Sequence, residues 1–356
     1  MMLPKLQHLL FHVSALTSVA LAGPVCSPKG WKILSPIAVA PRQEQATVAL
    51  SDTQLAIIGG IVPNEAGTGF DTTTMVQIYD IPSDSWSTAE PLPVPLNHPN
   101  AAVVDGKIYV LGGLTPDENG SWNATRGCWV YDPEGDDGWL ELGDMPEGEE
   151  RGSATMGVHG SKIILAGGME VLVPGPGNEQ RTVSRVTAYD TATREWSVWP
   201  DLPVERDHAG GAVVDERLYV LGGRRFGQRN VTDTVFSIDL EHPEEDWMLS
   251  EARMPTPRGG LAAGTVTVKD KKDGKKKTLV YTFGGEGNPE DGSEGMFDQV
   301  EVFDPRDGGS WTKVAEGMPV PKHGTAAVGI GGGVYIPGGG ITEGGSPVDA
   351  FEVYFP

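Results

Sequence analysis

The sequence predicts an all-β fold in which six repeated units close into a six-bladed propeller, and three observations support this. A short apolar run ending in two glycines occurs six times, with the pairs starting at positions 59, 112, 167, 222, 284 and 338. A bulky residue plus Asp and then a tryptophan follow in five of the units. A lone tryptophan segment precedes the first unit. Self-similarity at this period is typical of propellers and related repeat folds.

Turn signals divide each unit into four short segments, which we name strands a to d in chain order. Strand b ends in the glycine pair, and strand c ends in a bulky residue and Asp, as in Tyr79-Asp80. Strand d carries the tryptophan, which is Trp86, Trp139, Trp196, Trp247 or Trp311. The spacings are too short for helices, so we expect antiparallel four-stranded sheets that stack radially around an axis, with aromatic rings between them.

The two ends of the chain indicate how the ring closes. The sixth unit has its glycine pair and a strand at 350–355, but no tryptophan follows. The segment at 31–34, Trp-Lys-Ile-Leu, has no strands of its own before it. We expect this segment to be strand d of the sixth blade, because closure removes the two open edges that a linear stack of sheets would leave.

A glycine pair after an apolar strand, followed by Tyr-Asp and then Trp, resembles the kelch repeat. The resemblance covers about residues 30–356 and departs from the pattern at Ile238, where the fourth repeat lacks its tyrosine. It implies a kelch propeller similar to the secreted kelch proteins of filamentous fungi, some of which are associated with secondary-metabolite pathways. The family also includes six-bladed bacterial sugar-acid mutarotases. Kelch relatives that are copper radical oxidases need a Cys-Tyr crosslink and further ligands, so we do not transfer that activity.

The N-terminus reads as a secretory signal peptide. Lys5 precedes an apolar run from Leu9 to Ala22, which ends in small residues suited to signal peptidase. The run is shorter than the roughly 20 apolar residues of a spanning helix, so we expect no membrane span and a secreted or secretory-pathway protein. The expected parts are a signal peptide at 1–22, an N-terminal tail at 23–29 and the propeller at 30–356.

Charge and secretion restrict the partners. The formal charge of −22 repels phosphate backbones, so we expect no nucleic-acid partner. One a–b turn at 269–277 holds six lysines; we interpret it as a solvated hairpin extension, with an anionic docking patch as the alternative.

Secretion would make Asn119, Asn123 and Asn230 glycosylation acceptors. All three lie in b–c loops, where sugars would hinder a large partner and leave a small-molecule entrance open, and we expect a monomer.

Two cysteines remain after removal of the signal peptide. Cys26 and Cys128 have one possible pairing in an oxidising compartment. The alternative is one buried thiol and one cysteine in a loose N-terminal tail, because the two residues lie in different parts of the repeat pattern.

Basic residues occur at or near the start of strand a in every unit, and we expect them to ring the mouth of a central channel on the side of the long b–c loops. They are Arg42, His98, Arg151, Arg206, His208, Arg258, Lys322 and His323. In an acidic protein such a collar attracts ligands of opposite charge, so we expect a polar or anionic small molecule as partner. The structural alternative is that each side chain hydrogen-bonds the blade backbone.

We assign catalytic roles to four residues and ligand binding to five. The catalytic candidates are Arg206, His208, His323 and Glu150. The binding candidates are Arg42, His98, Arg151, Arg258 and Lys322. The acidic neighbours Glu44, Glu150 and Asp207 are either bases beside these cations or their salt-bridge partners. We expect no cofactor and no metal, although His98, His208 and His323 come from alternate units and could bind a transition metal if they converged.

The predicted function is binding of a polar small molecule in the central funnel. Arg, His and carboxylate groups could isomerise or cyclise it by acid–base chemistry without a cofactor. The resemblance suggests a tailoring or accessory protein in fungal secondary-metabolite, polyketide-type biosynthesis. The alternative is a non-catalytic scaffold that binds a protein or a glycan on the loop face. Motifs for a nucleophile elbow, a phosphate-binding loop or a dinucleotide site are absent from the sequence.

Overall fold

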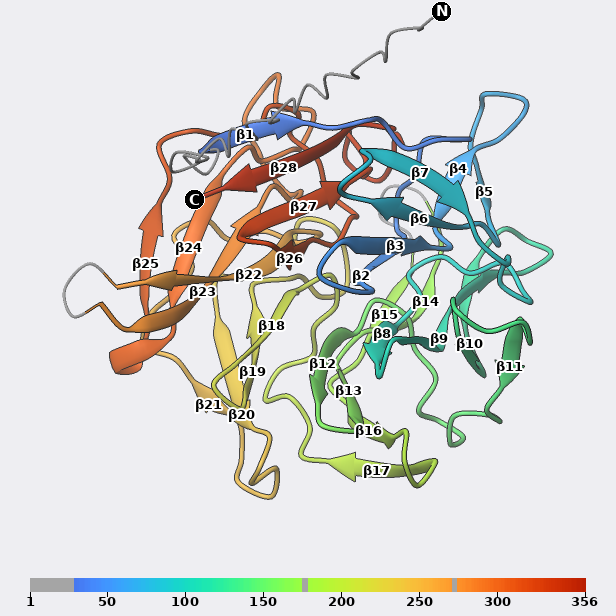
Figure 1. Ribbon diagram of the computed structural model, residues 1–356, viewed down its shortest axis with the longest axis horizontal. Helices are drawn as coiled ribbons and strands as arrows, with labels where there is room; N and C mark the ends of the chain where they lie inside the picture. The colour runs from blue at the N-terminus through green and yellow to red at the C-terminus, as the bar shows by residue number, and fades with distance from the viewer. Residues whose placement is uncertain (1–28, 175–178, 271–273) are drawn as a thin grey trace, which may run out of the picture.

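The protein is described by a computed structural model that covers residues 29–174, 179–270 and 274–356. Six antiparallel sheets surround a central axis, which confirms the predicted propeller (Figure 1). The expected signal peptide, most of the expected tail and Cys26 lie outside the described residues. Within the described ranges, no helix has the length and apolar character that crossing a membrane requires.

Each blade runs from the axis outward as strands a to d. Blade 1 consists of β2 (Ala46–Ala49), β3 (Gln54–Ile58), β6 (Val76–Asp80) and β7 (Ser85–Thr88). Blade 2 consists of β8 (Ala101–Val104), β9 (Lys107–Pro116), β10 (Trp122–Tyr131) and β11 (Trp139–Glu141). Blade 3 consists of β12 (Thr155–His159), β13 (Lys162–Ala166), β16 (Val186–Asp190) and β17 (Glu195–Trp199). Blade 4 consists of β18 (Gly210–Val214), β19 (Arg217–Leu221), β20 (Val235–Asp239) and β21 (Met248–Leu249). Blade 5 consists of β22 (Ala262–Lys269), β23 (Lys276–Phe283), β24 (Val300–Asp304) and β25 (Ser310–Lys313). Blade 6 consists of β26 (Val328–Ile330), β27 (Gly333–Pro337), β28 (Phe351–Phe355) and β1 (Gly30–Ile33).

Two b–c loops contain hairpins of their own. In blade 1 the loop forms β4 (Ile61–Pro63) and β5 (Phe70–Thr72), and in blade 3 it forms β14 (Met169–Leu172) and β15 (Gln180–Thr182). The second hairpin pairs with β10 of blade 2 through β14, so this loop extends the neighbouring sheet. A single 3-10 turn at Arg306–Gly308 links strands c and d of blade 5.

The N-terminal segment closes the ring as expected. Strand β1 pairs antiparallel with β28, and Trp31 lies opposite Tyr354 in the register. The Trp31 ring lies 5.1 Å from the Tyr354 ring and 5.7 Å from the Phe283 ring of blade 5. The first described strand therefore stabilises the last blade and also its contact with the preceding blade (Figure 1).

The hydrophobic core lies between blades. Six clusters of buried apolar residues each combine side chains from two adjacent blades, one cluster for every blade-to-blade contact in the ring. Within blades, the aromatic residue of strand c contacts the tryptophan of strand d, as in Tyr79 and Trp86, whose ring centres are 5.0 Å apart. Such pairs add about 0.5–1.5 kcal/mol beyond area burial. Ile238 replaces this ring in blade 4 without loss of the blade.

The glycine pairs are explained by the contact between neighbouring blades. In blade 6, Gly338 has a φ of +64°, and a Cβ atom there would lie 2.4 Å from the backbone oxygen of Arg42 in blade 1. The next residue, Gly339, donates its N–H to that same oxygen at 2.8 Å. The equivalent bond from Gly60 of blade 1 reaches Leu96 of blade 2 at 2.7 Å. Only glycine combines this backbone conformation with such a close approach.

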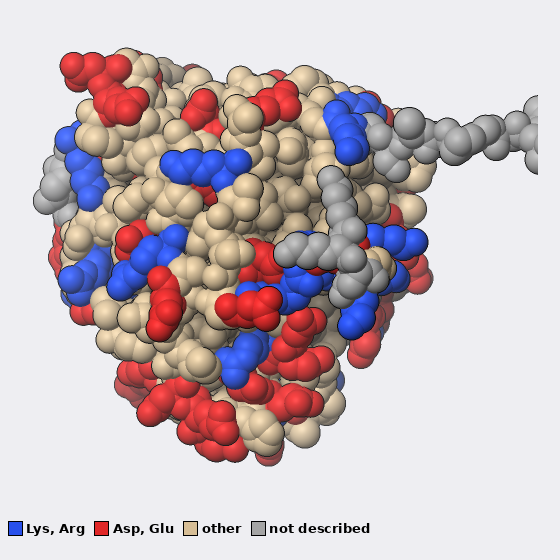
Figure 2. Space-filling view, turned by 90° about the vertical axis from the view of Figure 1, so that its left-hand side faces the viewer, with Lys and Arg blue, Asp and Glu red and all other residues tan. Residues whose placement is uncertain are grey.

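Charged side chains of both signs mix on the surface. On the side of the molecule that Figure 2 shows, Asp and Glu are interspersed with Lys and Arg. In the lysine-rich turn between β22 and β23, Lys277 pairs with Asp304 at 3.0 Å and with Asp270 at 3.6 Å. The interpretation of this turn as a solvated hairpin extension stays a prediction.

Candidate functional site

An equivalent three-residue segment precedes strand a in every blade. The segments are Arg42-Gln43-Glu44, Leu96-Asn97-His98, Arg151-Gly152-Ser153, Arg206-Asp207-His208, Arg258-Gly259-Gly260 and Lys322-His323-Gly324. In each segment the second residue bridges to the residue after a glycine pair. The third residue always has a positive φ, between +50° and +64°. These shared features align the six segments, so positions can be compared between blades.

The third residues form a ring of hydrogen bonds around the axis. Around the ring, the bonds are His98 N–H to Glu44 O at 2.8 Å, Ser153 N–H to His98 O at 3.0 Å, His208 N–H to Ser153 Oγ at 3.2 Å, Gly260 N–H to His208 O at 2.8 Å, Gly324 N–H to Gly260 O at 3.0 Å and Glu44 N–H to Gly324 O at 2.7 Å. Four third residues are not glycine, although the left-handed conformation costs such residues roughly 1–3 kcal/mol. Strain of this kind clusters at functional sites.

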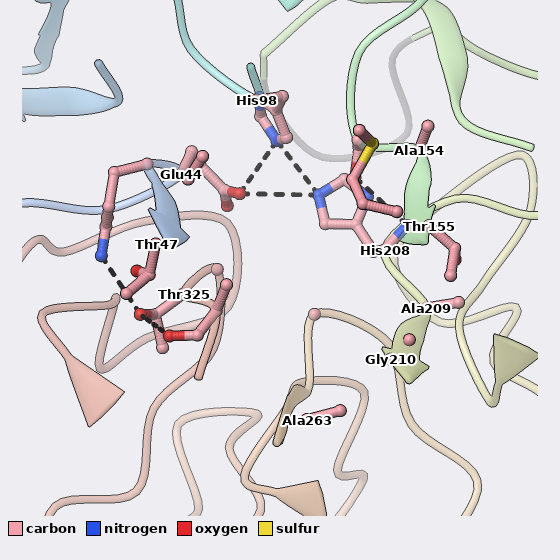
Figure 3. A pocket seen from close by; sticks show the side chains of 18 of the residues that line it. Glu44, Thr47, His98, Ala154, Thr155, His208, Ala209, Gly210, Ala263 and Thr325 are labelled. Atoms are coloured by element: carbon pink, nitrogen blue, oxygen red, sulfur yellow. Dashed lines mark hydrogen bonds and ion pairs between the residues drawn. The ribbon is translucent and has the colours of Figure 1, made fainter. Parts of the chain in front are cut away.

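Three of these four side chains meet at one point, and we call Glu44, His98 and His208 the axial triad (Figure 3). The Nε2 atom of His98 lies 3.0 Å from Oε2 of Glu44 and 3.1 Å from Nε2 of His208. The third side of this triangle, from His208 Nε2 to Glu44 Oε2, measures 3.8 Å. The side chains are 9, 2 and 3% exposed for Glu44, His98 and His208. Blades 1, 2 and 4 thus contribute one polar group each to a nearly dry site.

Both imidazole rings are oriented by the preceding residue of their own segment. The Nδ1–H of His208 donates to the Asp207 carboxylate at 2.6 Å, which can only accept. The Nδ1–H of His98 donates to Oδ1 of Asn97 at 2.7 Å, and the amide group of Asn97 is fixed by its own bond to Thr72 at 2.8 Å. Both Nε2 atoms therefore face Glu44 and each other.

The buried charges shift the pKa values of this site in opposite directions. Burial, reinforced by the charge of Arg224, lowers the pKa of His208 to about 4. Burial alone would raise the pKa of Glu44, but the attraction of His98 and its hydrogen bond outweigh it and hold that pKa well below its usual range. At neutral pH, Glu44 is therefore a carboxylate and His208 a neutral imidazole.

A second charged group lies behind the triad and was missed in the sequence. Arg224 Nη2 lies 3.2 Å from His208 Nε2, and the same guanidinium pairs with Glu286 and, at 3.4 Å, with Asp207. The carboxylate of Glu286 lies 3.4 Å from His323 Nδ1. Arg224 and Glu286 are the residues directly after their glycine pairs, where the first three blades have Ile61, Leu114 and Met169. A charged residue at a position that is otherwise apolar was the signal that could have identified them.

The triad lies at one end of a cavity in the central channel. This cavity has a volume of about 270 Å³ and is lined by residues of all six blades, among them Thr47, Thr155 and Thr325 (Figure 3). A second hollow, which shares Thr47 and Met156 with the first, continues along the strands a toward the a–b turns. On the loop side, Trp122 packs against His98 with 5.7 Å between ring centres.

On the loop side of the channel, blades 1 to 3 contribute buried apolar side chains, and blades 4 and 5 contribute the buried pair of Arg224 and Glu286. Ile61, Leu114, Trp122 and Met169 form one cluster, and they come from β4, β9, β10 and β14 of blades 1 to 3. The predicted channel mouth on the side of the b–c loops is therefore corrected: the cavity extends along the strands a, away from this cluster.

Five of the predicted collar residues lie away from the channel. Arg42, Arg151, Arg206, Arg258 and Lys322 are the first residues of their segments, are at most 3% exposed and do not line the cavity. Arg42 donates to Gly59 O at 2.9 Å, and Arg258 pairs with buried Glu301 at 2.7 Å. This placement corrects the expectation that these residues surround the channel mouth, and it matches the structural alternative of bonds within the blade.

The remaining sequence candidates divide between the site and its surroundings. His98 and His208 line the cavity, whereas His323 is the second residue of its segment, and its Nε2 lies 3.1 Å from Thr342 O. Glu150 accepts the N–H of Gly148 at 2.9 Å in the d–a connection and does not line the cavity. Glu44, considered either as a base beside the cations or as their salt-bridge partner, is the carboxylate that the structure brings to the axis.

The expected covalent modifications concern residues away from the cavity. Cys128 is buried in β10, and burial raises the pKa of its thiol to about 12. Its expected partner Cys26 lies outside the described residues, so the disulfide stays a prediction. Asn119 and Asn230 are exposed, while Asn123 is half-buried and donates to Asp117 at 3.1 Å. Glycosylation of these three residues also stays a prediction.

Comparison with known proteins identifies kelch relatives. The model of the KLHDC2/KLHL20/DRC7 Kelch-repeats domain matches residues 142–339, and that of the Kelch motif matches residues 95–146. The chain is 39% identical over 316 residues to Kelch-like protein terF of Aspergillus terreus, covering 89% of this chain and 65% of that protein. It is 28% identical over 235 residues to Kelch-like protein 15 of Danio rerio, covering 62% and 37%. The chain thus spans at most 65% of the length of these relatives.

A solved structure described as "Structure of YjhT" superimposes with a TM-score of 0.69 at 16% sequence identity. The match covers 90% of this chain and 97% of that one. At this identity the likeness concerns the fold.

Proposed function

This chain belongs to the kelch-repeat family, and from that premise we propose that it binds a small polar metabolite in its central cavity and transforms it at the axial triad. The observation that carries the proposal is the convergence of Glu44, His98 and His208, three buried titratable groups, on one cavity. A concave site with a few convergent polar groups and shifted pKa values has the character of an active site. The cavity lies slightly below the roughly 300–1,000 Å³ of pockets for drug-sized ligands, which favours a small metabolite.

The proposed chemistry is proton transfer. His208 presents an unprotonated Nε2, because its proton lies on Nδ1 toward Asp207. This lone pair can act as a general base once a substrate replaces the hydrogen bond from Arg224 Nη2. The proton that His208 takes up can pass over the 3.1 Å contact to the Nε2 lone pair of His98, which lies 3.0 Å from the anionic Glu44, and return to the substrate from there. Such a pair suits isomerisation or cyclisation of a metabolite with an acidic C–H or enolic O–H, and acid–base groups of this kind contribute about 10²–10⁴-fold to rates.

The proposed setting is fungal secondary metabolism outside the cell or in the secretory pathway. The resemblance to secreted fungal kelch proteins and the 39% identity to an Aspergillus terreus kelch-like protein support it. The protein would act there as a tailoring or accessory protein for polyketide-type products.

The test is untargeted metabolite comparison of a producing strain, its deletion mutant and complemented strains. We expect the deletion to accumulate one precursor, and His208→Gln to lower its conversion by about 10²-fold or more. The matched control is His242→Gln, which changes an exposed histidine outside the axial triad. A strain complemented with this variant should form the product again. Full restoration by His208→Gln at equal protein level would contradict the proposed role of the triad.

A non-catalytic scaffold is the second candidate, and one observation favours it. Three large apolar side chains on b–c loops of different blades are exposed: Phe70, Phe226 and Ile341, at 39, 53 and 37%. Exposed apolar groups on loops suit a protein or glycan surface. If this is the main function, Phe226→Ser should abolish partner binding, while His208→Gln leaves it intact.

A further inference from the structure

We propose that the axial triad is the binding site of one divalent transition-metal ion, held by Oε2 of Glu44 and the Nε2 atoms of His98 and His208. These three ligand atoms all lie within 4.8 Å of one another. The inference does not depend on the small-molecule binding proposed above. A bound ion would occupy both Nε2 lone pairs, so it would replace the acid–base role proposed for His98 and His208.

The distances between the ligand atoms fit a metal ion. Ligands about 2.1 Å from an ion, at angles of about 90–110°, lie about 3.0–3.4 Å from each other. The observed separations from His98 Nε2 are 3.0 and 3.1 Å. The remaining separation, 3.8 Å between His208 Nε2 and Glu44 Oε2, is about 0.4 Å longer than this range and would shorten on binding. The spacing is that of three ligands on one face of a coordination sphere.

The three atoms that would bind the ion are all acceptors when both rings carry their proton on Nδ1. Each Nδ1–H is already used, by Asp207 for His208 and by Asn97 for His98. Two Nε2 lone pairs and a carboxylate oxygen therefore face one another. Arg224 donates to one of these atoms, His208 Nε2, whereas one cation between the three atoms would satisfy all three acceptors.

The surroundings also match those of metal-binding histidines. Such histidines usually donate their other ring N–H to a carboxylate or carbonyl group, which fixes the ring and the tautomer. Asp207 and Asn97 do this here, and Asp207 is itself held by Gln180 at 2.7 Å and Thr182 at 2.5 Å. Both orienting residues belong to the same three-residue segments as the ligands, so the backbone ring positions the ligand and its partner together.

One contact opposes the ion and must be replaced. Arg224 Nη2 lies 3.2 Å from His208 Nε2 and donates to the atom that would bind the metal. The guanidinium keeps Glu286 and Asp207 as partners if this bond is lost. The charges of Glu44, Asp207 and Glu286 together outnumber that of Arg224, so the site has negative charge left for a divalent cation.

The ligand set indicates the class of metal. Two imidazoles and one carboxylate suit Fe(II), Zn(II) or Mn(II), and this combination with open positions is typical of non-haem iron sites. Thr47, Thr155 and Thr325 line the cavity beside the triad, where the open positions would accept a substrate oxygen. The sequence predicted no metal and weighed only the trio of histidines. The structure replaces His323 of that trio with Glu44.

The experiment uses the full-length protein, purified without a polyhistidine tag and stripped with EDTA. Fe(II) without oxygen, Zn(II) and Mn(II) are titrated separately and followed by calorimetry and by elemental analysis of the dialysed complex. We expect about one equivalent of bound metal. Glu44→Gln, His98→Gln and His208→Gln should each weaken binding by about 100-fold or more, since even changes of orienting residues cost about 10–100-fold.

His323→Gln is the matched control, because it removes a buried histidine from the same network but not from the triad. We expect it to stay within about threefold of the wild-type affinity. Circular dichroism establishes which variants are folded. Titration of the wild-type protein with Co(II) gives a second readout without any variant, since nitrogen and oxygen ligands intensify and shift its visible bands.

The proposal is overturned if the wild-type protein binds none of these ions with a dissociation constant below about 100 µM, which corresponds to a binding free energy of roughly 5.5 kcal/mol. It is also overturned if adding the protein does not change the Co(II) spectrum. Folded triad variants that keep the wild-type affinity would also overturn it. If the metal is absent but metabolite conversion still depends on His208, the acid–base function stands and only this inference fails.

Discussion

For single residues, position within the three-residue segment decides whether a side chain serves the blade or the axis. The first residue turns into its own blade, where Arg258 meets Glu301. The third residue turns to the axis, where Glu44, His98 and His208 meet (Figure 3). Along a regular strand, residues two apart would face the same side, but the positive φ of the third residue breaks this alternation.

The first prediction compares two arginines at the same segment position. Arg258→Leu leaves the fully buried Glu301 without its main partner, and we expect it to lower the free energy of unfolding by about 3–5 kcal/mol. Arg206→Leu should cost less than about 1.5 kcal/mol, because Arg206 has no ion pair with a buried carboxylate among the described residues. Its guanidinium donates to Thr234 O at 3.4 Å and lies 4.9 Å from the centre of the Phe236 ring. Blade 2 already has Leu96 at this position. Chemical unfolding of both variants checks this, and equal losses would contradict it.

The second prediction concerns pH. Burial lowers the pKa of His208 and of His323 to about 4, against about 6.5 in an unfolded chain. Between pH 7 and 5 the unfolded chain binds protons that the folded protein does not, so stability falls as the pH falls. We expect a loss of about 2 kcal/mol per histidine in metal-free protein. Denaturant unfolding at pH 7 and pH 5 measures this loss of stability, and His323→Gln should reduce it by about half. Equal stability at the two pH values would contradict the low pKa of the two histidines.

The sequence could predict part of this site. His98 and His208 were recognisable as polar residues ahead of strand a, and Glu44 as an acidic neighbour. It was not predictable that the Arg206 side chain turns into its blade while the His208 side chain turns to the axis, because this depends on a backbone φ of +52° at His208. Nor was the pairing of Arg224 with Glu286, which come from different blades and meet only after the ring has closed.

Among the secondary-structure elements, the glycine pairs connect each strand b to the next blade. Their spacing located the blades correctly, since conformation and close approach both require glycine there. Sequence reasoning did not find the β14–β15 hairpin that extends the sheet of blade 2, because its pairing depends on how two loops pack rather than on a local pattern.

The third prediction compares two glycines with similar backbone conformations. Gly338 and Gly331 have φ values of +64° and +59°. A Cβ atom on Gly338 would meet the Arg42 oxygen at 2.4 Å, whereas nothing lies within 4 Å of one on Gly331. We expect Gly331→Ala to cost about 1–2 kcal/mol for the left-handed conformation alone, and Gly338→Ala at least about twice as much. Thermal unfolding of both variants tests this, and a Gly338→Ala midpoint equal to that of Gly331→Ala would be inconsistent with it.

For the molecule as a whole, closure was predictable because the missing tryptophan of the last unit matched the surplus one near the N-terminus. Which end of the channel is accessible was not predictable. Loop length pointed to the b–c side, but buried side chains lie there, among them the cluster around Trp122. Such a cluster depends on side chains from three blades packing together.

The fourth prediction removes the closing strand. A chain that starts at residue 36 lacks β1 and exposes the edge of β28, so we expect a loss of about 3 kcal/mol or more and association between chains through this edge. A chain that starts at residue 29 keeps β1 and serves as the control. Thermal unfolding and size-exclusion chromatography compare them. A peptide of residues 29–35 should restore the shorter chain, and unchanged stability without it would contradict the role of β1.

The ring of hydrogen bonds between the six segments has a consequence for how this protein can evolve. Propellers change blade number when a repeat is duplicated or deleted, and the circumference of the inner ring changes with it. Glu44, His98 and His208 come from the first, second and fourth positions of a six-membered circle, and their separations hold only for that circumference. A descendant with five or seven blades could keep all three residues and still lose the contact between them, so selection for the site is also selection for the number six.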